Sequence, residues 1–358
     1  MRITRRNIIS AGATTFALAS MNVQTAASEG QTGTTPVTKV PFKIAAIQAE
    51  SVYLDLKGGI EKTVDLIGKA AAQGASLVAF PELWLPGYPF GHEGADWREA
   101  RLKTYVENSL VIGGEEWKIL LSTAKKNNII VSVGYSERDV DHLFIGQALI
   151  GSDGNPIQIR RKLRPSGGER TVWSDSDASG LKVFDTPLGR IGSLSCWEHM
   201  HPQMTYIMQA QMENVHIGAW PVLPEVEGFA WAGPKVNLAS ARYYATLTNA
   251  VTVVPCGVVG DLMFGEFQKF SKSLWVPKGG GYARIFGANG LEISESLAPT
   301  EEGIVMAAVD PSEFSRKAYD SEGEFSYGVL NFIHENYPGP RVPDQDHSQK
   351  NMVSIRTF

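Results

Sequence analysis

The sequence predicts an α/β fold with mixed sheets, and two observations lead to this prediction. From Phe42 onward, short apolar runs of strand character alternate with segments whose apolar residues have helical spacing. Hairpin-like turns, such as the Gly-Ser-Asp-Gly-Asn segment at 151–155, join neighbouring strand-like runs, so the sheets cannot be wholly parallel. The chain contains 43% hydrophobic and 20% charged residues, as expected of a globular protein with an apolar core.

The first 27 residues are predicted to be an export signal and not part of the fold. Arg5 and Arg6 precede a weakly apolar stretch that ends near Ala19, and small residues follow at 25–27. Paired arginines before such a stretch resemble a twin-arginine signal, which implies a periplasmic or secreted protein exported after folding. Residues 28–41, rich in Gly, Thr, Ser and Pro, are predicted to be a linker. The alternative for the first segment is an uncleaved tail.

The expected elements follow in chain order. The first helix is predicted from Ile60, Val64, Ile67 and Ala71, which lie at helical spacing, and from Gly74, which closes the segment. The expected strands are 42–49, 77–80, 129–135, 143–150, 157–162, 181–185, 190–195, 215–217, 251–255, 272–286 and 303–309. The expected helices are 59–73, 97–106, 115–126, 202–213 and 235–249.

The chain has two cysteines, and their surroundings differ. Cys196 ends the strand-like run at 190–195, shortly before a helix opened by Pro202. At such a turn, backbone N–H groups and the helix dipole favour an anion, which lowers a thiol pKa. The alternative is an inert, buried cysteine, which is the interpretation we adopt for Cys256 in the apolar run at 250–259. Two cysteines imply no disulfide framework.

Two further strand ends carry charged residues. Glu82 follows a buried strand and lies near Trp84 and Tyr88, where burial would raise a carboxyl pKa and suit the group to proton transfer. Lys162 ends the strand at 157–162. Taken alone, these two residues would be interpreted as an exposed loop carboxylate and a solvated cation.

Three segments, in this order, resemble the Glu, Lys and Cys motifs of the nitrilase superfamily. They are Phe80-Pro81-Glu82-Leu83, Arg161-Lys162-Leu163 and Ser195-Cys196-Trp197-Glu198. Flanking segments at 84–89, 169–173, 196–199 and 216–221 resemble the nitrilase branch, whose members hydrolyse carbon–nitrogen triple bonds. The resemblance extends from about residue 42 to about residue 327 and covers most of the chain.

The resemblance implies a four-layer α-β-β-α sandwich of the nitrilase type. It also implies pairing through the helices into a homodimer or larger homo-oligomer. We expect the carbon–nitrogen hydrolase domain at 42–330 and a C-terminal tail at 331–358, extended from about residue 334.

The resemblance further implies roles for the residues that carry it. Cys196 would be the nucleophile and Glu82 the general base. Lys162 and the backbone N–H of Trp197 would stabilise the developing negative charge. A thioimidate and then a thioester would form on the cysteine, releasing ammonia and then the acid.

Glu169 and two histidines are assigned from their position beside the motifs. Glu169 resembles the second glutamate of the family and would orient Lys162 or the substrate, with an ion pair to a neighbouring arginine as the alternative. His199 and His201 lie near Cys196 in sequence and could form a Cys–His pair. We assign them structural or pocket-lining roles, because the family's base is a glutamate.

Five aromatic or polarisable side chains within the matching segments are expected to bind substrate. They are Trp84, Tyr88, Trp173, His199 and Trp220. Together they predict an apolar pocket for an aryl, arylalkyl or aliphatic nitrile, although core packing is the alternative for each of them. Cysteines and histidines show no metal-ligand spacing, so no metal and no cofactor is expected.

The predicted function is hydrolysis of an organic nitrile to the carboxylic acid and ammonia. An amidase, a carbamoyl hydrolase or a cyanide-hydrating enzyme would keep the same three motifs. A non-catalytic exported binding protein is the alternative from another class. The formal net charge of −5 argues against nucleic acid or an anionic membrane surface as partner, and no apolar stretch of about 20 residues exists to span a bilayer.

Overall fold

The structure is a computed structural model that describes residues 37–357, except 271–275, 316–318, 321–322 and 337–350. The predicted export signal at 1–27 and most of the predicted linker therefore lie outside the described residues. Among the described helices, none is both long and apolar enough to cross a membrane.

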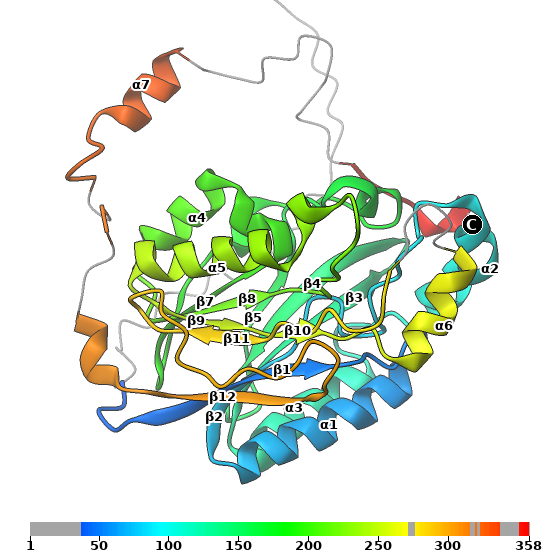
Figure 1. The fold of residues 1–358 in the computed structure, drawn as a ribbon, viewed down its shortest axis with the longest axis horizontal. Coiled ribbons are helices and arrows are strands. Elements are labelled where there is room, and N and C mark those ends of the chain that lie inside the picture. The colour runs from blue at the N-terminus through cyan, green and yellow to red at the C-terminus, as the bar shows by residue number, and fades with distance from the viewer. Residues whose placement is uncertain (1–36, 271–275, 316–318, 321–322, 337–350, 358) are drawn as a thin grey trace, which may run out of the picture. The chain divides into compact units, whose positions relative to one another are not determined.

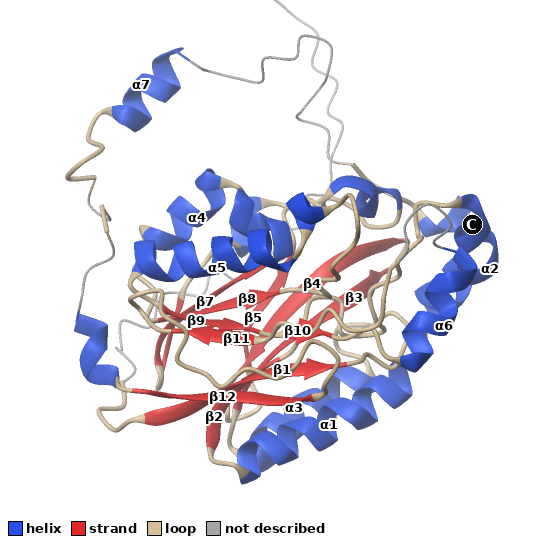
Figure 2. Cartoon of the chain, viewed as in Figure 1, coloured by secondary structure: helices blue, strands red, loops and turns tan. Residues whose placement is uncertain are grey.

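Two β-sheets form the centre of the described part of the chain (Figures 1 and 2). The seven-stranded sheet has the order β10 (Cys256–Gly257), β1 (Phe42–Ala49), β2 (Ala75–Ala79), β3 (Ile130–Asp139), β4 (His142–Ile150) and β5 (Pro156–Arg161), with β12 (Gly303–Val309) also paired to β1. The five-stranded sheet has the order β11 (Arg284–Phe286), β9 (Val251–Val254), β8 (Val215–Ala219), β7 (Gly189–Ser195) and β6 (Phe184–Thr186).

Strand direction determines which strand ends meet. In the larger sheet β2 and β3 are parallel, whereas β4 is antiparallel to both β3 and β5. Strands β2 and β5 therefore run in the same direction, and the residues that follow them emerge at the same edge of the sheet. In the smaller sheet β7, β8 and β9 are parallel. The sheets are mixed, as the sequence predicts.

Alternation along the strands produces the layers. In β1, Ile44 packs with Ile217 and Val253 between the two sheets, whereas Ile47 faces the opposite way. The outer face of the larger sheet is covered by α1 (Leu56–Ala72) and α3 (Glu115–Asn127), and that of the smaller sheet by α4 (Pro202–Gln209) and α5 (Pro234–Thr248) (Figure 1). Each fully buried Ile or Leu in these layers stabilises the fold by about 1.5–3 kcal/mol. The predicted α-β-β-α sandwich is confirmed.

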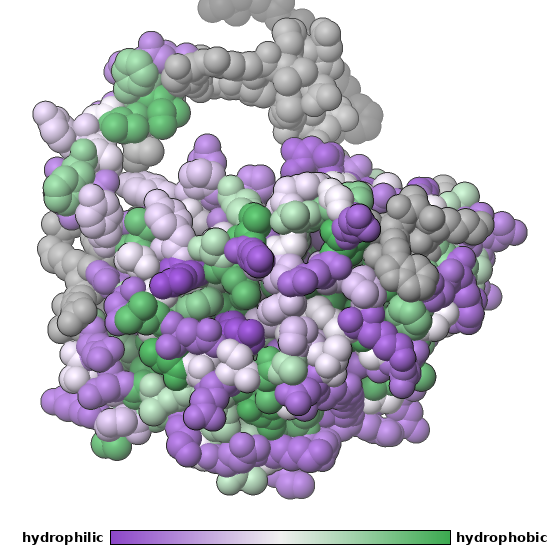
Figure 3. Space-filling view, in the orientation of Figure 1, coloured by the Kyte–Doolittle hydropathy of each residue, from purple (hydrophilic) through white to green (hydrophobic). Residues whose placement is uncertain are grey.

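The remaining described helices are α2 (Ala95–Glu107), α6 (Asp261–Phe270) and α7 (Val329–Asn336). On the face shown in Figure 3, hydrophilic side chains predominate and hydrophobic ones are scattered among them. The buried apolar residues form the clusters between the sheets and beneath the helices.

Element boundaries differ from the prediction in several places. Helix α1 begins three residues before the predicted start, because the side chain of Asp55 caps it by accepting from the N–H of Gly58 at 2.9 Å. Helix α6 was not predicted. Within the predicted strand at 272–286, the described residues form a strand only at β11.

The C-terminal segment is not simply an extended tail. Helix α7 includes residues 334–336, which were expected to be extended. Residues near the end return to the domain: Ser354 forms a β-bridge with His142. The backbone N–H of Asp175 donates to the carbonyl of Asn351 at 2.8 Å.

Candidate active site

Glu82 and Lys162, which follow the parallel strands β2 and β5, meet in the interior. Lys162 Nζ donates to Glu82 Oε1 at 2.8 Å and to Glu169 Oε2 at 2.9 Å. Glu82 is only 2% exposed, Lys162 1% and Glu169 4%. A charged lysine is tolerated at this depth because two carboxylates face it.

Glu169 is held by the turn that follows β5. It lies in the short 3-10 helix Gly167–Thr171, where the N–H of Ser166 donates to Glu169 Oε2 at 2.7 Å and the side chains form a capping box. Tyr88 donates its hydroxyl to Glu169 Oε1 at 3.3 Å. Among the described residues Glu169 forms its ion pair with Lys162 and not with the neighbouring Arg164 or Arg170, and Arg164 instead pairs with Asp175 at 3.7 Å.

Cys196 lies at a sharp turn between β7 and the 3-10 helix Cys196–Met200. Its φ of +49° is in the left-handed region, which costs a non-glycine residue about 1 kcal/mol or more and is often found at functional sites. The turn is held by a second capping box, in which the N–H of Ser195 donates to Glu198 Oε2 at 2.9 Å. Cys196 is therefore presented at the wall of a pocket.

A buried ion pair ties the lysine strand to the cysteine turn. One guanidinium nitrogen of Arg160 donates to both oxygens of Glu198 at 2.7 Å, and both side chains are 1% exposed. The N–H of Leu163 donates to Glu198 Oε1 at 3.1 Å. Although burial alone would raise it, the Arg160 charge holds the pKa of Glu198 below its usual range. Residues on either side of Lys162 thus share one carboxylate with the turn that carries Cys196.

A chain of buried polar groups, His199, His216 and Glu213, contacts the same turn at the backbone carbonyl of Cys196. His199 Nδ1 lies 2.7 Å from the carbonyl of Cys196, His199 Nε2 lies 3.0 Å from His216 Nε2, and His216 Nδ1 lies 2.8 Å from Glu213 Oε2. In the first link the ring must donate, because a backbone carbonyl can only accept. Tyr244 donates to Glu213 at 2.6 Å.

His199 therefore supports the nucleophile turn and is not placed as a base. Burial, reinforced by His216, lowers the pKa of His199 to about 3, so its ring is neutral. Its Nδ1 proton is used on the Cys196 carbonyl. This contact leaves a glutamate, and not a Cys–His pair, as the candidate base.

Burial shifts the pKa of the candidate nucleophile, Cys196, and of the candidate base, Glu82. Burial raises the pKa of the Cys196 thiol well above its usual range and Glu82 raises it further, while Lys162 and the N–H of Trp197 oppose this. Lys162 and the turn N–H lower the thiol pKa in the predicted direction, but desolvation outweighs them, so this pKa is raised overall. Burial also raises the pKa of Glu82 to about 7, partly offset by Lys162.

The resting arrangement pairs a neutral thiol with a carboxylate that can accept its proton. Burial acts to lower the pKa of Lys162, but Glu169 and Glu82 raise it well above its ordinary value, so the amine stays charged. Glu82 Oε1 is bound to this amine, whereas Glu82 Oε2 is buried and has no hydrogen-bond partner among the described residues. That oxygen is the free acceptor of the site.

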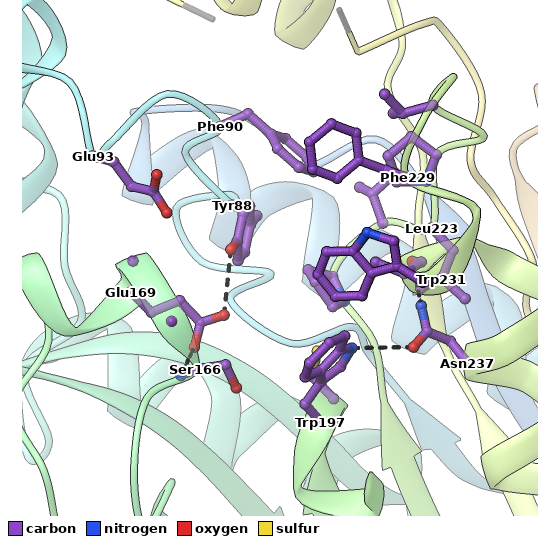
Figure 4. A pocket seen from close by; sticks show the side chains of 18 residues that line it. Tyr88, Phe90, Glu93, Ser166, Glu169, Trp197, Leu223, Phe229, Trp231 and Asn237 are labelled. Carbon is purple, nitrogen blue, oxygen red and sulfur yellow. Dashed lines mark hydrogen bonds between the residues drawn. The ribbon is translucent and has the colours of Figure 1, made fainter. Parts of the chain in front are cut away.

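A cavity of about 280 Å³ opens at Cys196 (Figure 4). Its polar side includes Tyr88, Glu93, Ser166 and Glu169. Its apolar side includes Phe90, Trp197, Leu223, Phe229 and Trp231. Of the five predicted substrate-binding residues, only Tyr88 lines this cavity.

The other four predicted pocket residues are part of the core, which corrects the prediction. Trp84 packs in the layer under α1. Trp173 is fully buried and donates its indole N–H to Ser136 Oγ at 3.0 Å. Trp220 is fully buried and stacks on His199 with ring centroids 5.5 Å apart. These three rings are packed in the core and do not line the cavity.

Most of the apolar wall comes from the segment 221–237, which runs from the end of β8 through an irregular stretch into the first turn of α5 and which the sequence analysis did not single out as a cavity wall. The signal in this segment was weak, because loop residues carry no periodicity. Its aromatic side chains are nonetheless unusually exposed, since Phe229 is 42% and Trp231 58% exposed.

Within the described residues, no group of three or more His, Cys, Asp or Glu could hold a metal ion.

Comparisons with known proteins agree with this geometry. Residues 43–319 match the family model described as carbon-nitrogen hydrolase. A nitrilase of Pseudomonas syringae pv. syringae (strain B728a) is 36% identical, and the match covers 86% of this chain and 93% of that protein. An arylacetonitrilase of Aspergillus kawachii is 39% identical over 79% and 88% of the two chains. An aliphatic nitrilase of Rhodococcus rhodochrous is 37% identical over 80% of each chain.

The fold also matches solved structures. A crystal structure of an amidase from Nesterenkonia sp. superposes with a TM-score of 0.60 at 16% identity, covering 84% of this chain and 98% of the amidase. At that identity the likeness establishes a common fold.

Proposed function

Because this chain belongs to the carbon–nitrogen hydrolase family, we propose that it is a nitrilase that converts an organic nitrile to the carboxylic acid and ammonia. The family predicted from the three sequence motifs is thus confirmed. Three relatives named as nitrilases, each 36–39% identical over most of both chains, support the activity. The observation that carries the mechanism is the unpartnered, buried oxygen of Glu82 in a site where Lys162 holds the other oxygen.

The first step joins the thiol to the nitrile. Cys196 Sγ attacks the nitrile carbon while its proton passes to Glu82 Oε2 and then to the nitrile nitrogen, which gives a neutral thioimidate. Transfer of the proton during the attack suits a thiol whose pKa burial has raised, because a free thiolate need not accumulate.

Two water molecules then complete the reaction. Glu82 takes a proton from the first water as it adds to the thioimidate carbon, and the tetrahedral species expels ammonia to leave a thioester. The second water attacks the thioester with the same base, which releases the carboxylic acid and returns the thiol. Departure of the thiol instead of ammonia from the first tetrahedral species would give the amide.

Lys162 is suited to stabilise the negative charge that develops on nitrogen or oxygen. Its ammonium has three N–H donors, and the two carboxylates occupy two of them. The third donor, with the backbone N–H of Trp197, would hold that charge, and loss of one such donor typically costs about 3 kcal/mol. Glu169 orients the amine through its own fixed contacts to Ser166 and Tyr88.

The test is a product assay on a small panel of aryl, arylalkyl and aliphatic nitriles and their amides, following acid, amide and ammonia. A nitrilase forms acid and ammonia from nitriles. Turnover of amides alone would indicate an amidase, and amide as the sole product a nitrile-hydrating enzyme. No turnover of any compound would indicate a binding protein and overturn the proposal.

We further propose export by the twin-arginine route, supported by Arg5 and Arg6 before a weakly apolar stretch. Arg5→Lys together with Arg6→Lys should keep the protein in the cytoplasm, as cell fractionation would measure. Normal periplasmic levels of the shortened protein in that variant would defeat the twin-arginine assignment.

We also propose a homodimer or larger oligomer formed through the α4 and α5 layer. Ile207, Val236 and Tyr243 on these helices are 41%, 39% and 65% exposed. Light scattering of the purified protein measures the mass. A monomer would refute the proposed association.

A further inference from the structure

Among the charged residues that line the cavity, Glu93 is exposed, and its carboxylate is open to solvent as well as to the cavity. It lines the cavity on the side of Tyr88 and Glu169, and Figure 4 shows its carboxylate directed toward the cavity. The side chain forms no hydrogen bond or ion pair with any described residue. Arg98 reaches only its backbone carbonyl, at 2.8 Å.

The carboxylate of Glu93 lies close to the turn that holds Glu169. A methyl group built on Gly168 would lie 1.6 Å from Glu93 Oε1, so a side chain at that position would displace the carboxylate. Glycine at 168 thus leaves room for Glu93 against the backbone of the turn.

The cavity carries uncompensated negative charge. Glu93 and Glu169 are the charged side chains that line it, and no described lysine, arginine or histidine does. Glu169 is paired with Lys162 at 2.9 Å, and Lys162 is also paired with Glu82 at 2.8 Å. The carboxylate of Glu93 is therefore available to a ligand bound in the cavity.

Aromatic rings lie on the other side of the same cavity. Phe90 packs on Tyr88 with ring centroids 4.9 Å apart, and Trp231 packs on Trp197 and Phe229 at 5.5 and 6.1 Å. The faces of such rings attract cations by about 0.5–2 kcal/mol. A carboxylate facing an aromatic wall is an arrangement that recognises an ammonium group.

We propose that this cavity selects nitriles that carry an amine, protonated at neutral pH, and rejects nitriles that carry a carboxylate. The proposal rests on the proposed nitrilase function and names the substrate class. The ammonium group would lie against Glu93 and the rings, with the nitrile at Cys196. The same charge would repel the carboxylate product and favour its release.

The test compares three nitriles that differ only in charge. They are 4-(aminomethyl)phenylacetonitrile, its neutral isostere 4-ethylphenylacetonitrile, and 4-carboxyphenylacetonitrile. The wild-type protein should give the highest kcat/KM for the ammonium compound and the lowest for the carboxylate. Glu93→Gln should lower the ratio of ammonium to neutral kcat/KM about tenfold, which corresponds to about 1.4 kcal/mol. The wild-type ratio should shrink from 20 to 300 mM salt, because added ions screen the charge.

Glu227→Gln is the matched control, since Glu227 is an exposed glutamate on the loop of the aromatic wall that does not line the cavity. It should leave the charge ratio unchanged. An unchanged ratio in Glu93→Gln, or a carboxylate substrate as good as the ammonium one, would overturn the proposal. If neutral nitriles were not hydrolysed either, the nitrilase function itself would fail. Calorimetry of the three nitriles with Cys196→Ala then tests the charge preference alone.

Discussion

The two cysteines of this protein share a property that is often taken to mark inert thiols. Burial raises the pKa of Cys196 well above its usual range, and it raises the pKa of Cys256 to about 12. A lowered thiol pKa therefore does not distinguish the nucleophile from the core residue.

Their neighbours distinguish them. Cys256 lies in β10, fully buried, with its thiol 3.3 Å from the carbonyl of Gly280, which cannot take up a proton at neutral pH. Cys196 lines a cavity and lies within the field of Glu82 and Lys162. We therefore attribute the reactivity proposed for Cys196 to its access to the cavity and to Glu82 as the proposed base.

The largest effect is expected when each of the two cysteines is replaced by alanine. Cys196→Ala should lower kcat/KM by at least about 10⁴-fold, because the covalent path is lost. Cys256→Ala should keep most of the activity and lower the free energy of unfolding by about 1–2 kcal/mol through a small cavity. Steady-state kinetics and thermal unfolding of both variants measure this, and an active Cys196→Ala would refute the assignment.

The second prediction removes the neighbours while keeping the thiol. Glu82→Gln cannot accept a proton, and general-base loss costs about 10²–10⁴-fold, with the upper end expected for a residue used in every step. Glu169→Gln can still hold Lys162 by a neutral hydrogen bond, so it should retain measurable activity and release more amide relative to acid. Product ratios on one nitrile decide the matter: equal, complete loss in both variants would make Glu169 a direct catalytic partner.

The third prediction concerns pH. Because Glu82 must be ionised to accept a proton and its pKa is about 7, kcat/KM should fall about tenfold per unit as the pH drops below 7. The Glu169 carboxylate contributes to this raised pKa of Glu82, so Glu169→Gln should move the acidic limb to lower pH. A pH–rate profile that is flat between 5 and 8 would be inconsistent with Glu82 as the base.

The smallest effect is expected from the histidine pair, His199 and His216, that contacts the backbone carbonyl of Cys196. His216→Gln keeps a polar group opposite His199 Nε2, whereas His216→Ala removes the partner of this nitrogen and leaves the Nδ1 contact to Cys196 in place. His216→Ala should lower kcat about tenfold with little change in KM, and His216→Gln should lose less. Equal KM increases in both variants would argue for a general structural role instead.

The sequence predicted the parts of the molecule in which the pattern is local. Strand β1 and the ends of β2, β5 and β7 follow from apolar runs, and the site residues Glu82, Lys162, Glu169 and Cys196 follow from motifs at those ends. The contacts of Lys162 with both carboxylates depend on the relative direction of the strands. The sequence predicted that these residues share a site only through the family resemblance.

The rest depended on packing. Trp84, Trp173 and Trp220 lie in matching segments, yet their rings point into the core, and sequence alone could not assign the direction of a ring. The sign of the Cys196 pKa shift was missed because it depends on how completely the site is desolvated. The cavity wall at 221–237 was missed because its residues are brought to Cys196 only by the fold.

The central claim is that Cys196, and not Cys256, forms a covalent intermediate with the nitrile. Its most direct test is mass spectrometry of peptides from wild-type protein quenched in acid during turnover of a slowly hydrolysed nitrile. The account predicts an acyl group on the peptide that contains Cys196, with the mass of the nitrile plus water minus ammonia. An acyl group on the Cys256 peptide, or acid formation with the Cys196 peptide unmodified at every quench time, would contradict it.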